Sequence, residues 1–328
     1  MTDWNHLADQ SLRGNPPTRE QARAVLNSTD DELLAVLHAA FRIRQQYHGR
    51  DVRIHVLKNA KSGLCPEDCS FCSQSVKFAT GVERYPLQSV AELVAGAREA
   101  AVMGAVKYCM VTSTRGPSER DLDVICEAVR QIKTELNINV CTSLGLLKEG
   151  QAERLAAAGV TRFNHNLESS RAHFPEICST HSYDDRIATV RAAKAAGMEA
   201  CCGGIMGMGE SLDDRVQLAF ELRALEVESI PVNFLDPRPG TPLGATPRLS
   251  PHDCLRALAM FRFVNPARDI RVAGGREVNL RQLQPLALYP ANSIFCNGYL
   301  TTPGQGPEAD TRMIVDAGFR VAELVPAL

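Results

Sequence analysis

Three cysteines that stand close together are the residues best suited to chemistry. Cys65, Cys69 and Cys72 have C-x₃-C-x₂-C spacing within the segment KNAKSGLCPEDCSFCSQ. Each iron of a [4Fe–4S] cluster normally takes one cysteine thiolate, so three thiolates hold three irons. The fourth iron would stay open for a small molecule, as catalytic zinc sites keep an open position. The triplet therefore predicts a cluster that binds a substrate, in preference to a zinc site completed by a distant histidine or three incidental thiols.

Three further cysteines fall within β-rich runs. They are Cys109 in KYCMVTS, Cys141 in NVCTSLG and Cys201 in EACCGGI. A free cysteine alone is most simply a small buried hydrophobe. Inward side chains of several barrel strands can nevertheless converge on one point, which would make a second metal site. Cys202 would face the opposite side of the strand from Cys201. The remaining cysteines are interpreted as structural: Cys126, Cys178, Cys254 and Cys296.

From about Arg53 onward, short β-rich runs alternate with amphipathic stretches, which is typical of parallel strands joined by helices. Strands are predicted near 53–57, 106–112, 138–144, 160–167, 199–206, 228–235, 270–274 and 292–296. Helices are predicted near 89–103, 119–135, 148–158, 183–197, 211–225, 250–263, 279–287 and 308–317. Eight such units favour an α/β fold of the (β/α)₈ TIM-type barrel over residues 51–328, preceded by a helical region over 1–50. The cysteine triplet follows the first strand, so it would lie at the mouth where active sites of this fold lie.

Composition favours a small-molecule substrate. The 328 residues carry a formal net charge of −2, which offers no electrostatic footprint for nucleic acid or an anionic membrane. No apolar run approaches the roughly 18 residues of a membrane span, and the first residues lack the apolar core of a secretory signal. An odd number of cysteines, 11, argues against a disulfide framework. We expect a cytoplasmic protein.

A polar ladder is predicted on the fourth strand. Asn164, Asn166 and Glu168 alternate in RFNHNLE and therefore share one face. Amide and carboxylate groups in that arrangement suit ribose hydroxyls or a cyclic urea. His165 faces the other way and is interpreted as a packing residue.

The triplet resembles the signature of the radical S-adenosylmethionine (AdoMet) superfamily. The pattern G-x-I-x-G-x-x-E, formed by Gly203, Ile205, Gly207 and Glu210, is similar to another motif of that superfamily. The resemblance implies that the open iron of a [4Fe–4S] cluster chelates AdoMet. It also implies that Gly203 and Ile205 lie against the adenine.

Over residues 50–320 the chain resembles the biotin synthase family. The resemblance is carried by YCMVTS, VCTSLG, NHNLE, C-x-GGI-x-G-x-GE, VNFL, GTPL, R-x-x-x-GRE and ANSIF. It implies sulfur insertion into dethiobiotin to form biotin by radical C–H activation. The sulfur would come from an auxiliary [2Fe–2S] cluster, whose implied ligands are Cys109, Cys141, Cys201 and Arg271. An arginine ligand is unusual because a guanidinium stays protonated. The simpler alternative pairs Arg271 with an acidic group such as Glu277 or with the AdoMet carboxylate.

The same resemblance implies roles for several polar residues and partners. Asn166 and Glu168 would bind the AdoMet ribose, and Asn166 with Asn233 would bind the dethiobiotin ureido ring. Arg186 would bind the AdoMet carboxylate, although a surface helix arginine accounts for it almost as well. The implied partners are a flavodoxin or ferredoxin-type electron donor, the iron–sulfur assembly machinery and a second copy of the chain in a homodimer. Rival interpretations are another radical AdoMet lyase or maturase, an electron-transfer module and a structural zinc protein.

Overall fold

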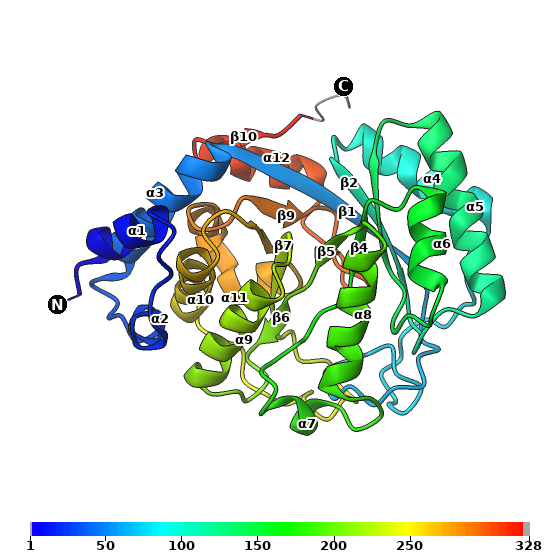
Figure 1. Ribbon diagram of the computed structural model, residues 1–328, viewed down its shortest axis with the longest axis horizontal. Helices are drawn as coiled ribbons and strands as arrows, with labels where there is room; N and C mark the ends of the chain where they lie inside the picture. Colours follow the sequence, from blue (N-terminus) through cyan, green and yellow to red (C-terminus); the bar gives the residue numbers. More distant parts are fainter. Residues whose placement is uncertain (1, 324–328) are drawn as a thin grey trace.

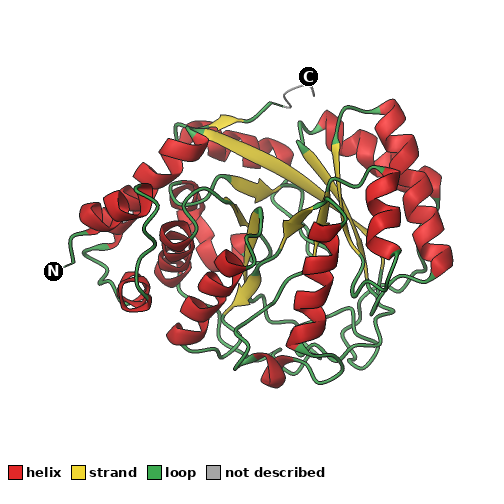
Figure 2. Cartoon of the chain, viewed as in Figure 1, coloured by secondary structure: helices red, strands yellow, loops and turns green. Residues whose placement is uncertain are grey.

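The computed structural model describes residues 2–323 and forms a closed barrel of parallel strands surrounded by helices (Figure 1, Figure 2). The strands that form the barrel are β1 (Asp51–Lys61), β2 (Lys107–Thr112), β3 (Asn139–Ser143), β4 (Arg162–Asn164), β5 (Glu199–Cys201), β6 (Gly204–Met206), β7 (Ser229–Phe234), β8 (Asp269–Val272) and β9 (Ser293–Phe295). The strands pair in parallel around the ring in the order β1, β2, β3, β4, β5, β7, β8 and β9, with β6 also paired to β7, and β1 closes the ring on β9. The predicted (β/α)₈ fold is confirmed.

The fifth position of the barrel is shared by two short strands. β5 pairs with β4 and contacts β7 at Cys201, and β6 pairs with β7 beyond the interruption at Cys202–Gly203. One continuous strand over 199–206 was expected. At the break Gly203 lies so close to β7 that a Cβ there would meet the carbonyl oxygen of Pro231 at 1.9 Å.

The outer helices are α4 (Val90–Val102), α5 (Glu119–Glu135), α6 (Gln151–Ala158), α7 (Phe174–Ile177), α8 (Tyr183–Ala195), α9 (Leu212–Ala224), α10 (Pro251–Val264), α11 (Arg276–Leu280), η1 (Arg281–Leu288) and α12 (Pro307–Asp316). Five of the outer helices, α4, α5, α8, α9 and α10, begin after a serine that caps them. Ser89, Ser182 and Ser211 each form a capping box with an acidic residue three positions later. Such caps satisfy amide groups that the first turn leaves free, which is why these helix starts were predictable.

Three helices precede the barrel and lie at its side (Figure 1). They are α1 (Trp4–Leu12), α2 (Arg19–Leu26) and α3 (Leu33–His48), and all three contact α10. Arg44 of α3 is fully buried and donates to the carbonyl oxygens of Gly49, Asp51 and Ala291. After α12, the strand β10 (Arg320–Val321) pairs with the start of β1. The helical region is therefore packed on the barrel.

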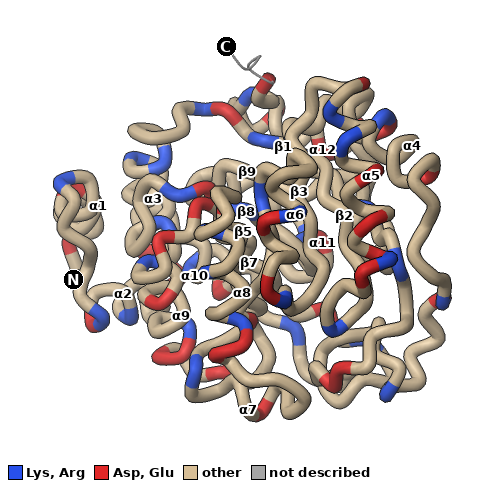
Figure 3. The backbone as a smooth tube through the Cα atoms, turned by 45° about the vertical axis from the view of Figure 1, so that its right-hand side comes forward, with Lys and Arg blue, Asp and Glu red and all other residues tan. Residues whose placement is uncertain are grey.

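Lys and Arg positions alternate with Asp and Glu positions along the backbone, with both signs interspersed (Figure 3). Within residues 2–323 no helix is both long and apolar enough to cross a bilayer.

Candidate active site

A cavity of about 290 Å³ opens among the barrel strands and the loops that follow them. The predicted cysteines of both groups line this one cavity: Cys65, Cys69, Cys72, Cys109, Cys141 and Cys201. Five of the other predicted residues line it too: Asn166, Glu168, Arg186, Asn233 and Arg271. Ile205 is also in the lining, whereas Gly203 is not. Residues scattered over more than 200 positions of sequence therefore meet in one place.

The triplet lies on a folded loop directly after β1. The amide of Cys65 donates to the carbonyl oxygen of Gln74 at 3.2 Å, and the amide of Val76 returns a bond to the Cys65 carbonyl at 2.9 Å. Among the described residues, the three triplet sulfurs do not all lie within 4.8 Å of one another. Sulfurs on one tetrahedral zinc would be about 3.8 Å apart. The three triplet sulfurs are therefore not arranged around a single zinc ion.

Burial holds these thiols in their protonated form when no metal is bound. It raises the pKa of Cys65 to about 11 and also raises that of Cys72. The pKa of Cys69 is raised by a hydrogen bond to Cys178 and by burial. Since metal ligation needs thiolates, loading this site must release protons.

Arg186 of α8 connects the triplet loop with the polar ladder. Its Nη1 donates to the carbonyl oxygen of Asn166 at 2.7 Å and lies 3.3 Å from Oε1 of Glu168, and its Nη2 lies 3.9 Å from the sulfur of Cys69. The residue is 5% exposed, which excludes the alternative of a surface helix arginine. A buried cation next to the triplet is well placed for a carboxylate ligand.

Glu168 has a left-handed backbone, with φ of +68°. The amide of Glu168 donates to the carbonyl oxygen of Gly203, and the carbonyl oxygen of Glu168 accepts from the amide of Ile205. Both bonds cross the interruption between β5 and β6. Burial raises the pKa of Glu168, with Arg186 opposing the shift. Its Oε2 is buried without a hydrogen-bond partner in the described part of the chain. That oxygen remains available for a ligand hydroxyl group.

The segment that carries the glycine motif packs closely against the backbone of Glu168. A Cβ at Gly204 would meet the Glu168 carbonyl oxygen at 2.5 Å, so the small residues allow neighbouring strands to approach. Glu210 accepts the amides of Gly207 and Met208 at 2.7 and 2.6 Å and pairs with Arg215. The structure thus explains Gly203 and Glu210 by backbone packing, and contact of Gly203 with adenine stays a prediction.

The three strand cysteines converge deeper in the cavity. Cys109 and Cys141 are paired neighbours in the register of β2 and β3. The neighbouring Cys109 thiol, together with nearby cations, lowers the pKa of Cys141 to about 7. Cys201 faces the cavity, whereas Cys202 is fully buried in the apolar core. Strand alternation therefore separates the two, as predicted.

Arg271 lies beside Cys201, with Nη1 3.5 Å from the sulfur. Its Nη2 donates to Ser229 at 2.8 Å and lies 3.3 Å from Asp269. The acidic partner is thus Asp269, and not Glu277 as one interpretation suggested; Glu277 pairs with Arg276. Asp269 and Cys201 raise the pKa of Arg271 despite its burial, so the side chain is a cation.

More cations than carboxylates surround the strand cysteines. Lys107 and Arg162 share Glu199 at 3.1 and 2.7 Å, and Arg162 also contacts Asp269 at 3.1 Å. The group therefore contains three cations, Lys107, Arg162 and Arg271. It contains two carboxylates, Glu199 and Asp269. Such an excess favours thiolates or an anionic cluster at this point.

Asn233 of β7 is built into the cavity wall. Its Nδ2 donates to the Gly204 carbonyl oxygen at 3.1 Å, and its Oδ1 accepts the Gly274 amide at 2.8 Å. An amide offers two hydrogens and two lone pairs, so each end retains one site for a ligand.

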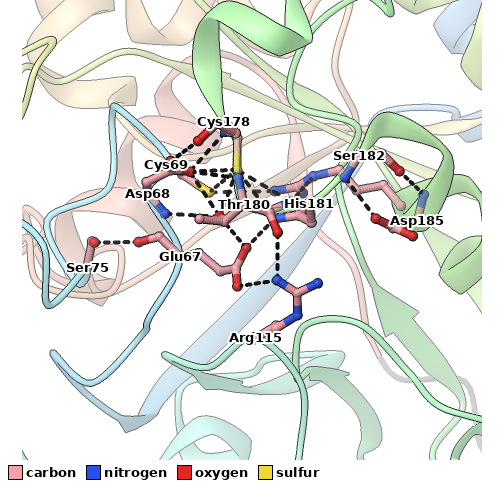
Figure 4. Close-up of polar contacts among 12 residues, drawn as sticks. Glu67, Asp68, Cys69, Ser75, Arg115, Cys178, Thr180, His181, Ser182 and Asp185 are labelled. Carbon is pink, nitrogen blue, oxygen red and sulfur yellow. Dashed lines mark hydrogen bonds and ion pairs between the residues drawn. The ribbon is translucent and has the colours of Figure 1, made fainter.

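Cys178 and His181 lie directly beside the triplet, although the sequence interpretation made Cys178 structural (Figure 4). Cys178 Sγ is 3.7 Å from Cys69 Sγ and 3.3 Å from His181 Nδ1. The hydrogen bond from Cys69 lowers the pKa of Cys178 to about 4, with a further contribution from His181. The C-x-x-H spacing of these two residues was the available signal.

Comparisons with known proteins agree with this geometry. Residues 61–222 match the family model of the Radical SAM superfamily, and residues 231–320 match that of the Biotin and Thiamin Synthesis associated domain. The solved structure of methylornithine synthase (PylB) superposes with a TM-score of 0.85 at 19% identity, covering 97% of this chain and 98% of that one. The hydrogenase maturase HydG from Carboxydothermus hydrogenoformans superposes with a TM-score of 0.81 at 16% identity, covering 96% and 78%.

The barrel, the triplet at its mouth and the first family match define an enzyme of the radical AdoMet type. Curated biotin synthases share high identity with the chain. The protein from Salinibacter ruber is 59% identical over 97% of this chain and 89% of its own length, and that from Rhodopirellula baltica is 54% identical over the same shares. The chain belongs to the biotin synthase family. Membership implies a [4Fe–4S] cluster, AdoMet and an auxiliary [2Fe–2S] cluster as cofactors.

Proposed function

We propose that this protein inserts sulfur into dethiobiotin to form biotin, as a sulfurtransferase of the radical AdoMet type. The observation that carries the proposal is that Cys65, Cys69 and Cys72 share one cavity with Cys109, Cys141 and Cys201. A substrate between the two groups would be within reach of both. The cofactors, when bound, supply hydrogen abstraction from unactivated carbon and a sulfide to replace the hydrogen.

The residues around the cavity would bind and orient the reactants. Arg186 would hold the AdoMet carboxylate beside the triplet, and Glu168 and Asn166 would hold the ribose, with Gly203 and Ile205 at the adenine. Asn166 and Asn233 would bind the ureido ring of dethiobiotin through their remaining donor and acceptor sites. Cys109, Cys141, Cys201 and Arg271 would hold the sulfur-donating cluster.

The barrel walls would keep water from the reacting carbon. The apolar lining includes Leu57, Phe234 and Phe295, and such surfaces exclude solvent that would otherwise quench a reactive species. We further propose that residues 51–328 are the catalytic barrel and 1–50 an accessory region. The protein would act in the cytoplasm as a homodimer, with a flavodoxin or ferredoxin-type donor and the iron–sulfur assembly machinery as partners.

An anaerobic assay tests the proposal. The reconstituted full chain would be incubated with AdoMet, a low-potential reductant and dethiobiotin, and 5′-deoxyadenosine and biotin would be measured by mass spectrometry. Cys109→Ala should abolish biotin formation, whereas Cys254→Ala, a substitution in the apolar core, should retain it. Production of 5′-deoxyadenosine without biotin in the unmodified chain would refute the substrate assignment.

A further inference from the structure

Cys69, Cys178 and His181 form a second cluster of metal-ligating side chains beside the cavity. One ligand atom of each lies within 4.8 Å of the others. Cys178 is 5% exposed and the His181 side chain 4% exposed. Cys178 and His181 come from the segment between α7 and α8, and Cys69 comes from the triplet loop; Figure 4 shows the three side chains converging.

Two of the separations among these atoms match those between ligands of a tetrahedral ion. Zinc–sulfur bonds of about 2.3 Å and zinc–nitrogen bonds of about 2.0–2.1 Å place two sulfurs about 3.8 Å apart, and a sulfur and a nitrogen about 3.5 Å apart. The observed separations are 3.7 Å between Cys69 and Cys178 and 3.3 Å between Cys178 and His181. Two of the three pairs therefore already stand near ligand separations, and the third pair, Cys69 Sγ and a ring nitrogen of His181, lies within 4.8 Å.

We propose that Cys69, Cys178 and His181 bind one thiophilic divalent cation of the zinc type in the chain that lacks its [4Fe–4S] cluster. Two sulfurs and an imidazole nitrogen are the donors such a cation prefers. Because Cys69 lines the cavity, an ion can reach the site from the barrel mouth. Asp68 Oδ1, 3.2 Å from the Cys178 sulfur, or a water molecule would complete the coordination.

Binding of an ion to His181 would change the hydrogen bonds that both of its ring nitrogens make. His181 Nδ1 is bonded to Glu67, and Nε2 accepts from Arg186 Nε at 3.0 Å. An ion on Nδ1 would replace the proton there and place a proton on Nε2, so the Arg186 bond would break. The Glu67 bond to Nδ1 would break as well, and Glu67 would keep the bonds that it accepts from Thr180 and Arg115.

Sharing Cys69 makes the mononuclear site and the cluster mutually exclusive, because one thiolate cannot serve both. Zinc in the cluster-free protein should therefore slow cluster assembly. This inference does not depend on the substrate of the enzyme, so it would survive failure of the proposed function.

The test is anaerobic titration of the full cluster-free chain with Co²⁺, whose thiolate absorption reports sulfur ligands, followed by displacement with Zn²⁺. Cys178→Ser and His181→Asn should each weaken Co²⁺ binding by more than about tenfold, at least the effect seen when an outer partner of a ligand is lost. Cys65→Ser should leave the affinity unchanged, because Cys65 is not a ligand of this site. Cys254→Ser serves as the control, and circular dichroism checks the folding of each variant.

Two outcomes would overturn the inference. If Cys65→Ser weakens binding and Cys178→Ser does not, the ion lies at the triplet. If neither Cys178→Ser nor His181→Asn changes the Co²⁺ affinity, the ion binds outside the proposed site. If Cys178→Ser fails to fold, His181→Asn decides the question by the same titration. A second readout is the rate at which visible cluster absorption develops: stoichiometric Zn²⁺ should slow it in the unmodified chain and much less in Cys178→Ser.

Discussion

Arg271 Nη1 lies 3.5 Å from the sulfur of Cys201, while Nη2 of the same guanidinium lies 3.3 Å from Asp269. One side chain thus connects the proposed auxiliary-cluster site with a buried ionic network. Asp269 in turn contacts Arg162 and accepts from Ser293 and Asn292. Arg271 is therefore held beside Cys201 by an ion pair and hydrogen bonds that do not depend on a metal.

The first prediction concerns the charge of Arg271. Because the raised pKa keeps it cationic beside Asp269, Arg271→Met should destabilise the full chain by about 3 kcal/mol, the scale of breaking a buried pair. Arg271→Lys keeps the charge and should cost about 1 kcal/mol, for loss of a hydrogen bond. Urea unfolding at neutral pH measures both. Equal losses in the two variants would show that the shape of the guanidinium, and not its charge, is what stabilises the fold.

The second prediction concerns Asp269 and pH. Burial alone would raise its pKa, but Arg271 and Arg162 hold the pKa well below its usual value. A carboxylate with a depressed folded pKa contributes stability above its unfolded pKa of about 3.9 and loses it as pH falls further. Asp269→Asn should therefore reduce the free energy of unfolding by about 3–5 kcal/mol at neutral pH. The difference from the unmodified chain should stay constant from pH 8 to 5 and shrink only below about 4. A difference that already shrinks between pH 8 and 5 would contradict this account.

The third prediction concerns the free oxygen of Glu168. Glu168→Gln retains the shape of the side chain but removes the charge that faces Arg186 and a ligand hydroxyl. Loss of one charged hydrogen bond should weaken AdoMet binding by about 10- to 100-fold. Equilibrium dialysis against the reconstituted chain measures the affinity, and Glu176→Gln on the exposed side of α7 is the control. Unchanged affinity would remove Glu168 from the AdoMet site.

The fourth prediction distinguishes a glycine required by its positive φ, Gly104, from a glycine required by close packing of strands, Gly203. A Cβ at Gly203 would meet the Pro231 carbonyl oxygen at 1.9 Å, whereas Gly104 has φ of +72° and nothing within 4 Å. Gly104→Ala should cost about 1 kcal/mol through backbone strain alone. Gly203→Ala must push β7 and the β5–β6 segment apart and should cost at least about 3 kcal/mol, as severe overpacking does. Thermal and urea unfolding compare them; similar small losses would mean that the strands can shift without penalty.

Much of the architecture could be predicted from local patterns. The alternation of β-rich and amphipathic segments predicted the barrel because parallel strands and crossover helices each leave a periodic signal. The position of the triplet directly after β1 predicted its place at the barrel mouth, and strand alternation predicted that Cys201 and Cys202 face opposite sides. These inferences succeed because they depend on neighbours in the sequence.

The remaining features depend on which distant segments meet. The sequence by itself determined the barrel, the cysteine triplet and the family to which the chain belongs. Only the tertiary structure decided that Asp269 pairs with Arg271, that Arg186 is buried beside Cys69, and that Cys178 and His181 lie against the triplet. The physical reason is that spacing along the chain sets periodicity within one strand or helix, whereas closure of the ring sets which side chains from different strands and loops share a cavity.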